Sequence, residues 1–250
     1  MDLEKLLHCM LDMAEEMTAC GAEVNRIEDT LTRLGLAYGA ERMNVFVITS
    51  SIVVTMDFPD GRHMTQSRRI LNSGGTDFKK LEALNELSRR CCADPMPVWQ
   101  LNEEIQKVET SALRRRYLYL GSMLAASAFA VFFGGGLWDG VAAACFAVLI
   151  CILQERLMPI CMNKVTFNLL CSIVVGIGIC LAARWIPVLH MDKIMIGDIM
   201  LLIPGIAMTN AVRDVLVGDT ITGIMRFIET FLWAGALACG FMAAIWLIGG

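Results

Sequence analysis

Apolar residues in the first forty positions recur every three or four residues, which is the spacing of one buried face of an α-helix. The first such pattern runs from Leu3 to Met17 and ends near Gly21, a residue type that often caps helix C-termini. The second pattern covers Ala22–Ala37 and places aliphatic residues inward. The sequence therefore predicts two amphipathic helices at the start of the chain.

The pattern then changes to one that is typical of strands. Asn44–Thr49 and Ile52–Phe58 are β-branched and apolar, and Arg62–Arg68 alternates well enough to return as a third strand. Pro59–Gly61, between the last two runs, is a turn signal. We expect a small antiparallel sheet.

Helical spacing resumes after the strands. Asp77 is placed to N-cap a helix that runs to about Cys92, with Phe78 and three leucines buried. A further helix is expected to begin after Pro97 and to run towards the second half of the chain. Helices and a small sheet together indicate an α+β domain.

Long apolar runs dominate from residue 117 onwards. A helix that spans a membrane needs roughly 20 apolar residues, and several runs approach that length. We expect five transmembrane helices, at about 117–133, 137–153, 165–187, 194–212 and 220–248.

The distribution of charge divides the chain at the same place. Charged residues make up 18% of the 250 residues, against about 25% in an average soluble domain. Residues 1–116 hold 15 of the 21 basic and 18 of the 25 acidic residues. The expected fold is a membrane protein: a cytoplasmic α+β domain over 1–116, followed over 117–250 by an all-α bundle of five transmembrane helices.

Basic residues beside the spans predict the orientation, because cytoplasmic loops carry an excess of Lys and Arg. With the N-terminus in the cytoplasm, the inner side holds Arg114, Arg115, Arg116, Arg156, Lys164, Arg213 and Arg226. The outer side holds only Arg184 and Lys193. We therefore expect a multi-pass protein whose N-terminus is cytoplasmic and whose C-terminus is outside.

Residue patterns of enzymes and metal sites are missing from the sequence. The ten cysteines form no CxxC pair, and the three histidines have no metal-ligand spacing. Hydrolase, kinase and dinucleotide motifs such as GxSxG and GxGxxG are absent. Cys91-Cys92 could form a metal or redox site, but reduced, packed thiols are the expected state. We predict no enzyme, no cofactor, no metal and no nucleic-acid partner.

The fourth expected span is unusual because it contains polar and helix-breaking residues. They are Asp198, Pro204, Gly205, Asn210, Arg213 and Asp214. A proline removes a backbone donor, and broken backbone persists in a membrane only where it faces protein or water. Polar residues at membrane depth suggest a pathway or a site. The alternative is a kinked structural helix whose Arg213, Asp214 and Asp219 lie at the membrane surface.

Two features of the N-terminal domain could bind a ligand. The run GAEVNRIEDT, Gly21–Thr30, gathers four ionisable side chains at one helix start: Glu23, Arg26, Glu28 and Asp29. Arg68-Arg69, followed by Asn72–Gly75, could hold an anion on side chains and exposed amides. The alternative for both is a solvated helix face and an ordinary loop.

Three separated stretches resemble the threonine/serine exporter (ThrE) family, and more closely its split-subunit, YjjP-like branch. They are GAEVNRIEDTLTRLGLAYGAERMNVFV (Gly21–Val47), RRILNSGGTDFKKLEALNELSRR (Arg68–Arg90) and LLIPGIAMTNAVRDVLVGDT (Leu201–Thr220). The resemblance covers nearly the whole chain. In fused family members a cytoplasmic domain and five spans precede a second membrane domain. The resemblance therefore implies a separate, small YjjB-like membrane subunit as partner.

The resemblance further implies export of threonine and serine, or of succinate, across the bacterial cytoplasmic (inner) membrane, driven by the proton gradient. The family pattern falls on Gly21, Glu23, Arg26, Glu28, Asp29, Arg68, Arg69, Pro204, Gly205, Asn210, Arg213, Asp214, Gly218 and Asp219. Five spans make a small bundle, so we expect a hetero- or homo-oligomer in the lipid bilayer.

All of these substrates carry a carboxylate, which a guanidinium can grip with two hydrogen bonds. We expect Arg213 to bind it, with Asn210 and backbone groups freed at Pro204-Gly205 as further contacts. The rival interpretation is that Arg213 forms a purely structural pair with Asp214.

Coupling to protons needs a carboxyl group whose environment is partly buried. Asp198 is our first choice, followed by Asp214 and Glu229. The alternative function is a membrane-tethered sensor or regulatory subunit whose cytoplasmic domain binds a ligand or a partner. The break at Pro204-Gly205 favours the exporter, since an anchor has little need of it.

Overall fold

The computed structural model describes residues 3–70, 76–108 and 115–248. Asn72–Gly75, half of the anion site expected from the sequence, lies outside these residues. The chain forms two compact units: Met1–Ala112 with Ile206–Phe227, and Leu113–Gly205 with Ile228–Gly250. The domain boundary at residue 116 stays a prediction.

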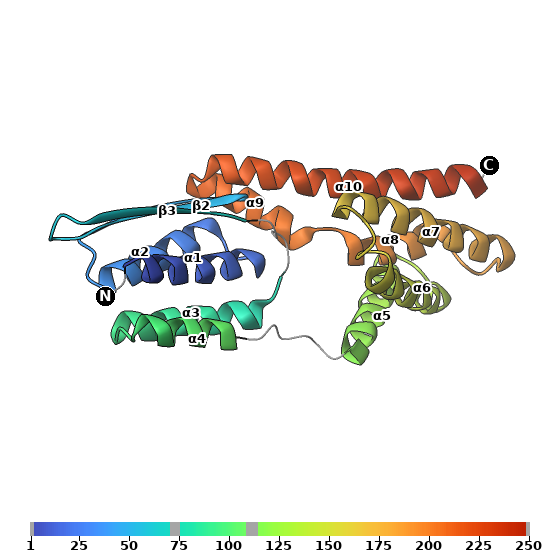
Figure 1. The fold of residues 1–250 in the computed structure, drawn as a ribbon. Coiled ribbons are helices and arrows are strands. Elements are labelled where there is room, and N and C mark those ends of the chain that lie inside the picture. Colours follow the sequence, from blue (N-terminus) through green and yellow to red (C-terminus); the bar gives the residue numbers. More distant parts are fainter. Residues whose placement is uncertain (1–2, 71–75, 109–114, 249–250) are drawn as a thin grey trace. The chain divides into compact units, whose positions relative to one another are not determined.

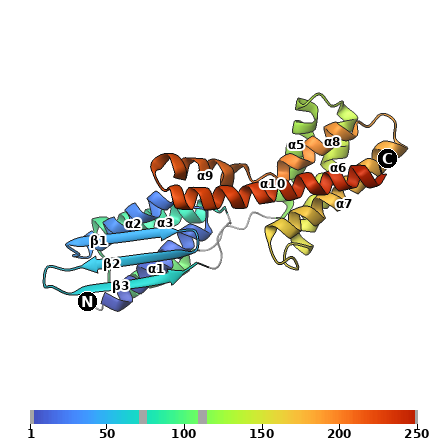
Figure 2. The ribbon, with the colours of Figure 1, turned by 90° about the horizontal axis from the view of Figure 1, so that it is seen from above.

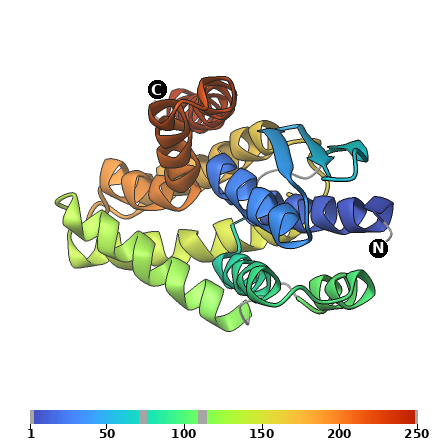
Figure 3. The same ribbon diagram turned by 90° about the vertical axis from the view of Figure 1, so that its left-hand side faces the viewer.

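The N-terminal part of the first unit has three layers. Its elements are α1 (Leu3–Ala19), α2 (Val24–Ala37), β1 (Arg42–Ile48), β2 (Ser51–Asp57), β3 (His63–Arg69), α3 (Phe78–Ala93) and α4 (Val98–Lys107). Helices α1 and α2 lie between the three-stranded sheet and the pair α3 and α4 (Figures 1 and 3). This α+β arrangement agrees with the elements expected from the sequence.

The sheet is an antiparallel meander in the order β1-β2-β3. Side chains alternate across a strand, and along β2 the buried ones are Ile52, Val54 and Met56. This row faces α1 and α2, whereas alternate residues such as Phe46 of β1, which is 55% exposed, lie on the open face. The predicted antiparallel sheet is confirmed.

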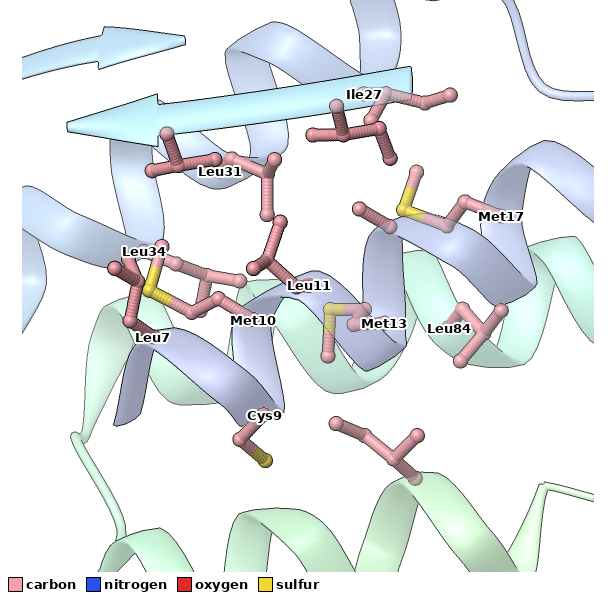
Figure 4. Packing of buried hydrophobic residues seen from close by; sticks show 14 of the residues in the cluster. Leu7, Cys9, Met10, Leu11, Met13, Met17, Ile27, Leu31, Leu34 and Leu84 are labelled. Atoms are coloured by element: carbon pink, nitrogen blue, oxygen red, sulfur yellow. The ribbon is translucent and has the colours of Figure 1, made fainter. Parts of the chain in front are cut away.

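Helix α1 supplies the centre of the core. It is buried on most of its circumference because it contacts the sheet on one side and α3 and α4 on the other. Figure 4 shows Met10, Leu11 and Met13 of α1 close to Leu31 of α2 and Leu84 of α3. Fully burying one such side chain contributes roughly 1.5–3 kcal/mol.

Helix α3 begins as expected, since the Asp77 carboxylate accepts a hydrogen bond from Lys80 N at 3.0 Å. The prediction that Phe78 is buried is wrong: it is 57% exposed, because it starts the helix and the buried face begins one turn later, at Leu81. Helix α4 ends at Lys107, and residues 109–114 lie outside the described part of the chain.

The second unit consists of apolar helices. They are α5 (Arg115–Phe132), α6 (Leu137–Arg156), α7 (Lys164–Trp185), α8 (Met191–Leu202) and most of α10 (Thr220–Ile248). Helix α8 packs against α5 and α6 (Figure 2). Glycine makes this packing possible, because a Cβ at Gly197 of α8 would lie 2.6 Å from the carbonyl oxygen of Ala126 in α5.

Three helices of the described residues, α6, α7 and α10, are long and apolar enough to cross a membrane. Helix α8 and α9 (Gly205–Val217) pass the same test together, but they are bent by 57° at the break between them. The predicted interruption at Pro204-Gly205 is therefore confirmed. Helix α5 does not reach the same apolarity, and its first two residues are Arg115 and Arg116. The number of five spans stays a prediction.

Candidate functional site

Two polar motifs that are far apart in the sequence meet in the first unit. The first is the start of α2, with Ala22 and Glu23, and the second is the hairpin of α9 and the first turns of α10. We call the resulting set of residues the motif cluster: Ala22, Glu23, Arg213, Asp214 and Arg226. Both motifs belong to the same compact unit.

Arg213 and Glu23 form the accessible ion pair of the motif cluster. Arg213 Nη1 donates to Glu23 Oε1 at 2.6 Å. The Arg213 side chain is 60% exposed, whereas that of Glu23 is 20% exposed. The guanidinium that we expected to bind a substrate carboxylate thus already binds a carboxylate of the protein, and it remains open to solvent on its other side.

Arg226 and Asp214 form the buried ion pair of the motif cluster. Arg226 Nη1 donates to Asp214 Oδ2 at 2.9 Å, and Arg226 Nη2 donates to the Ala22 carbonyl at 3.4 Å. Only 17% of the Arg226 side chain and 4% of the Asp214 side chain are exposed. Removing one member of such a pair is costly, since the other charge stays buried. The rival interpretation paired Asp214 with Arg213, whereas the observed partner of Asp214 is Arg226.

The α9–α10 hairpin holds these side chains in place. Gly218 has a φ of +108°, in the left-handed region that side chains other than glycine rarely adopt, and it ends α9. Helix α10 then packs closely against α9 at Gly223. A side chain would not fit there, because a Cβ at Gly223 would lie only 2.7 Å from the backbone N of Val215. Gly218 and Gly223 therefore bring Asp214 and Arg226, which are 12 residues apart, onto facing helix surfaces.

Glu28 lies one turn further along α2. Its Oε1 accepts a hydrogen bond from Val47 N at 3.0 Å, at the end of β1. Burial raises the pKa of the Glu28 carboxyl, the Val47 hydrogen bond acts in the opposite direction, and the negative charge of Asp219 raises the pKa further. Glu28 thus joins α2 to the sheet, but burial and the negative charge of Asp219 destabilise its ionised form.

Replacing Glu28 by glutamine is expected to stabilise the protein at neutral pH. The pKa of the Glu28 carboxyl is higher in the folded protein than in the unfolded chain. The protonated carboxyl therefore contributes its full stabilisation below the unfolded pKa, and this contribution is lost as the pH rises through the folded pKa. Glutamine keeps the acceptor for Val47 and has no charge. The stability difference between Glu28→Gln and wild type should therefore grow from about pH 4 to about pH 7.

The measurement is thermal unfolding of the full chain in detergent across this pH range. Glu41→Gln is the control, because Glu41 is exposed. The control should show no such growth with pH. A Glu28→Gln variant that becomes less stable relative to wild type as pH rises would contradict the expectation.

The remaining motif residues of the N-terminal domain have separate surroundings. Arg68 donates to Glu15 Oε2 at 3.0 Å and is also bonded to Asp12 and to His8 Nδ1. Its guanidinium therefore holds α1 against β3, while Arg69 is exposed on the opposite face. Arg68 and Arg69 thus point to different sides of the sheet.

Asp198 is the most unusual carboxylate of the second unit. Its side chain is fully buried in α8, and neither oxygen has a hydrogen-bond partner among the described residues. An ionised carboxylate in such a place would cost several kcal/mol. Helix α8 ends four residues later, at Leu202, directly before the break at Pro204.

The three carboxylates expected to carry protons thus differ in their surroundings. Asp198 is buried and has no hydrogen-bond partner within residues 3–70, 76–108 and 115–248, Asp214 is buried against Arg226, and Glu229 is exposed on α10. Of the other residues expected at a substrate site, Asn210 is half-buried on α9, and Pro204 and Gly205 form the break itself.

Sequence reasoning did not find two of the residues in these networks. The sequence marked Arg226 only as a basic residue near a span. Its positive charge, 12 residues after the negative charge of Asp214, was a signal that the two side chains could pair. The other is His190, the N-cap residue that precedes α8. Its backbone N donates to Asp139 Oδ1 at 2.7 Å, and its Nδ1 lies 3.0 Å from Asp139 Oδ2. Asp139 Oδ2 also accepts from Gly136 N at 2.7 Å, so it joins the α5–α6 turn to the α7–α8 loop.

Comparison with known proteins agrees with the motifs. Residues 8–248 match the family model described as putative threonine/serine exporter. The chain belongs to this family. Membership indicates a transporter rather than an enzyme, and together with the apolar helices it indicates a membrane protein.

Two relatives carry more specific names. The chain is similar to a threonine/serine exporter of Corynebacterium glutamicum, with 23% identity over 211 residues, which are 82% of this chain and 43% of that protein. It is also similar to a protein of Klebsiella aerogenes named probable succinate transporter subunit YjjP, with 25% identity over 92% of this chain and 88% of that protein. The chain thus spans less than half the length of the Corynebacterium exporter. No solved structure is significantly similar to the chain.

Proposed function

We propose that the chain is one subunit of a proton-driven exporter of small metabolites that carry a carboxylate. Family membership supports export, and the name of the Klebsiella relative supports a subunit of a larger transporter. The partner subunit would be a separate YjjB-like membrane protein. The N-terminus would be cytoplasmic and the C-terminus outside.

The observation that carries the proton-driven part of this proposal is the buried carboxyl of Asp198, for which the described part of the chain offers no hydrogen-bond partner. A group that takes up and releases a proton during transport must be stable without its charge in one state and must meet water or a cation in another. The surroundings of Asp198 fit the first condition, because its side chain is fully buried on α8, which packs against α5, α6 and α7, and has no hydrogen-bond partner among the described residues. The break at the end of α8 is a place at which α8 can move to fulfil the second.

Arg213 is proposed to bind the substrate carboxylate in exchange for Glu23. Both anions are carboxylates, so a substrate can replace Glu23 on the guanidinium without a change in hydrogen-bond geometry. The exposed side of Arg213 gives a substrate access. In this scheme Glu23 keeps the site paired while it is empty, and Asn210, one turn before Arg213 on α9, is a further polar contact.

The test is efflux from cells preloaded with labelled threonine, serine or succinate. The chain is expressed alone and together with a YjjB-like subunit, with and without a protonophore. We expect efflux of one substrate class only when both subunits are present, and we expect the protonophore to abolish it. A stable complex that exports none of the three would contradict the proposed substrates and would favour a sensor or regulatory subunit.

A further inference from the structure

A hollow between α2 and α3 carries an excess of positive charge. Its volume is about 470 Å³, which is within the range of about 300–1,000 Å³ that is usual for small-molecule sites. Arg26 and Arg33 line it from α2, and Arg89 lines it from α3. Asp29 is the only carboxylate among the residues that line it. Three guanidiniums thus share one hollow with a single negative charge.

The helix geometry brings these groups together. Arg26 and Arg33 are seven residues apart, which places them two turns apart on the same face of α2. That face meets α3, where the corresponding row contains Ser88, Arg89 and Cys92. Polar side chains from both helices therefore line the hollow, and one of them, Ser88, is buried.

The charges in the hollow are incompletely paired. Arg33 Nε binds Asp29 Oδ1 at 2.9 Å, and Arg89 binds Glu86, which does not line the hollow. No hydrogen-bond acceptor for Arg26 is found in the parts of the chain that the structure describes. The side chains of Arg33 and Arg89 are 70% and 66% exposed, so a solute can reach them.

We propose that this hollow, which we call the arginine groove, binds a small metabolite with two or more negative charges on oxyanion groups. Guanidiniums bind carboxylates and phosphates through paired hydrogen bonds. Because the two arginines lie two turns apart, each can bind one end of an elongated anion that carries a negative charge at both ends. A ligand with a single negative charge, or a zwitterion, offers only one such end. The site lies in the N-terminal domain, apart from the motif cluster residues, and its occupancy does not depend on whether the chain transports that anion.

Binding is tested on the full chain in detergent by calorimetric titration with succinate, pyrophosphate and threonine. We expect saturable binding of at least one of the two dianions, with threonine much weaker. Succinate alone would identify a dicarboxylate site, and pyrophosphate alone a phosphate site; either result supports the proposal. Absence of saturable binding of both would overturn it.

The variants Arg26→Gln and Arg33→Gln locate the site. Each should weaken binding of the dianion about tenfold or more, because each removes a charge-assisted hydrogen bond. Arg62→Gln is the matched control: it removes an arginine of similar exposure, 59%, that pairs with Asp60 in the β2–β3 turn. Equal affinities of the Arg26, Arg33 and Arg62 variants would exclude the arginine groove.

A second measurement does not need a variant. Burial raises the pKa of the Cys92 thiol, and the nearby Arg33 opposes this effect. Because Cys92 lines the groove, a bound dianion should slow its alkylation by a maleimide, as followed by peptide mass spectrometry. Cys161, in the loop between α6 and α7, should react at the same rate with and without the anion. Unchanged alkylation of Cys92 at saturating anion would place the binding elsewhere.

Discussion

Replacing Asp198 by asparagine is expected to abolish proton-driven export while leaving the protein folded. Asparagine has nearly the same shape, so the packing of α8 against α5 and α6 is retained. It cannot release a proton, and the coupling step is therefore lost. Protonophore-sensitive efflux should fall to the level of cells that lack the protein.

Stability distinguishes this outcome from simple misfolding. The Asp198 oxygens have no partner among the described residues, so a neutral side chain removes no ion pair there. The variant should unfold at a temperature no lower than that of wild type at neutral pH. A matched control on the same helix is Asp192→Asn, since the Asp192 side chain is 64% exposed and pairs with Lys193. Export by Asp198→Asn at the rate of the control variant would remove Asp198 from the mechanism.

Local features of this fold followed from the sequence because short-range physics determines them. The β-branched, apolar run at Ile52–Phe58 predicted strand β2, the Asp77 carboxylate predicted the start of α3, and Pro204-Gly205 predicted the end of α8. Each of these depends on residues within about one or two turns of the chain. Phe78 shows the limit, since periodicity does not say where along a helix the neighbouring layer begins.

The motif cluster could not be predicted in the same way. Arg213 and Glu23 are 190 residues apart, and a hydrophobic pattern identifies which face is apolar but not which charges meet across it. The sequence therefore offered only Asp214 as a rival partner for Arg213 within the protein, although neighbours on a helix point in different directions. Likewise, the sequence identified Asp198 as polar at membrane depth, whereas the packing of the described helices determines that no hydrogen-bond partner among them reaches it.

Replacing Arg226 by methionine is expected to destabilise the protein strongly. The substitution leaves Asp214 buried without its cation and deprives the Ala22 carbonyl of a donor. Breaking a buried ion pair in this way costs about 3–5 kcal/mol. The variant should accumulate in the membrane at a much lower level than wild type, and it should unfold at a lower temperature in detergent.

The double variant Asp214→Leu with Arg226→Met should recover most of the lost stability, because apolar residues of similar volume often replace a buried ion pair without cost. Recovery would show that the damage in the single variant comes from the stranded charge. The Arg213→Met variant is the comparison, since its partner Glu23 is more exposed and Arg213 itself is 60% exposed; we expect a loss of less than about 1 kcal/mol there.

Export by the double variant then decides the role of Asp214. If the Asp214–Arg226 pair only fixes the hairpin to the start of α2, the recovered protein should export at a rate close to that of wild type. If Asp214 carries a proton, the double variant should be folded and inactive. Because Asp214 is already bound to Arg226 whereas Asp198 has no partner among the described residues, we expect export to persist in the double variant and to be lost in Asp198→Asn.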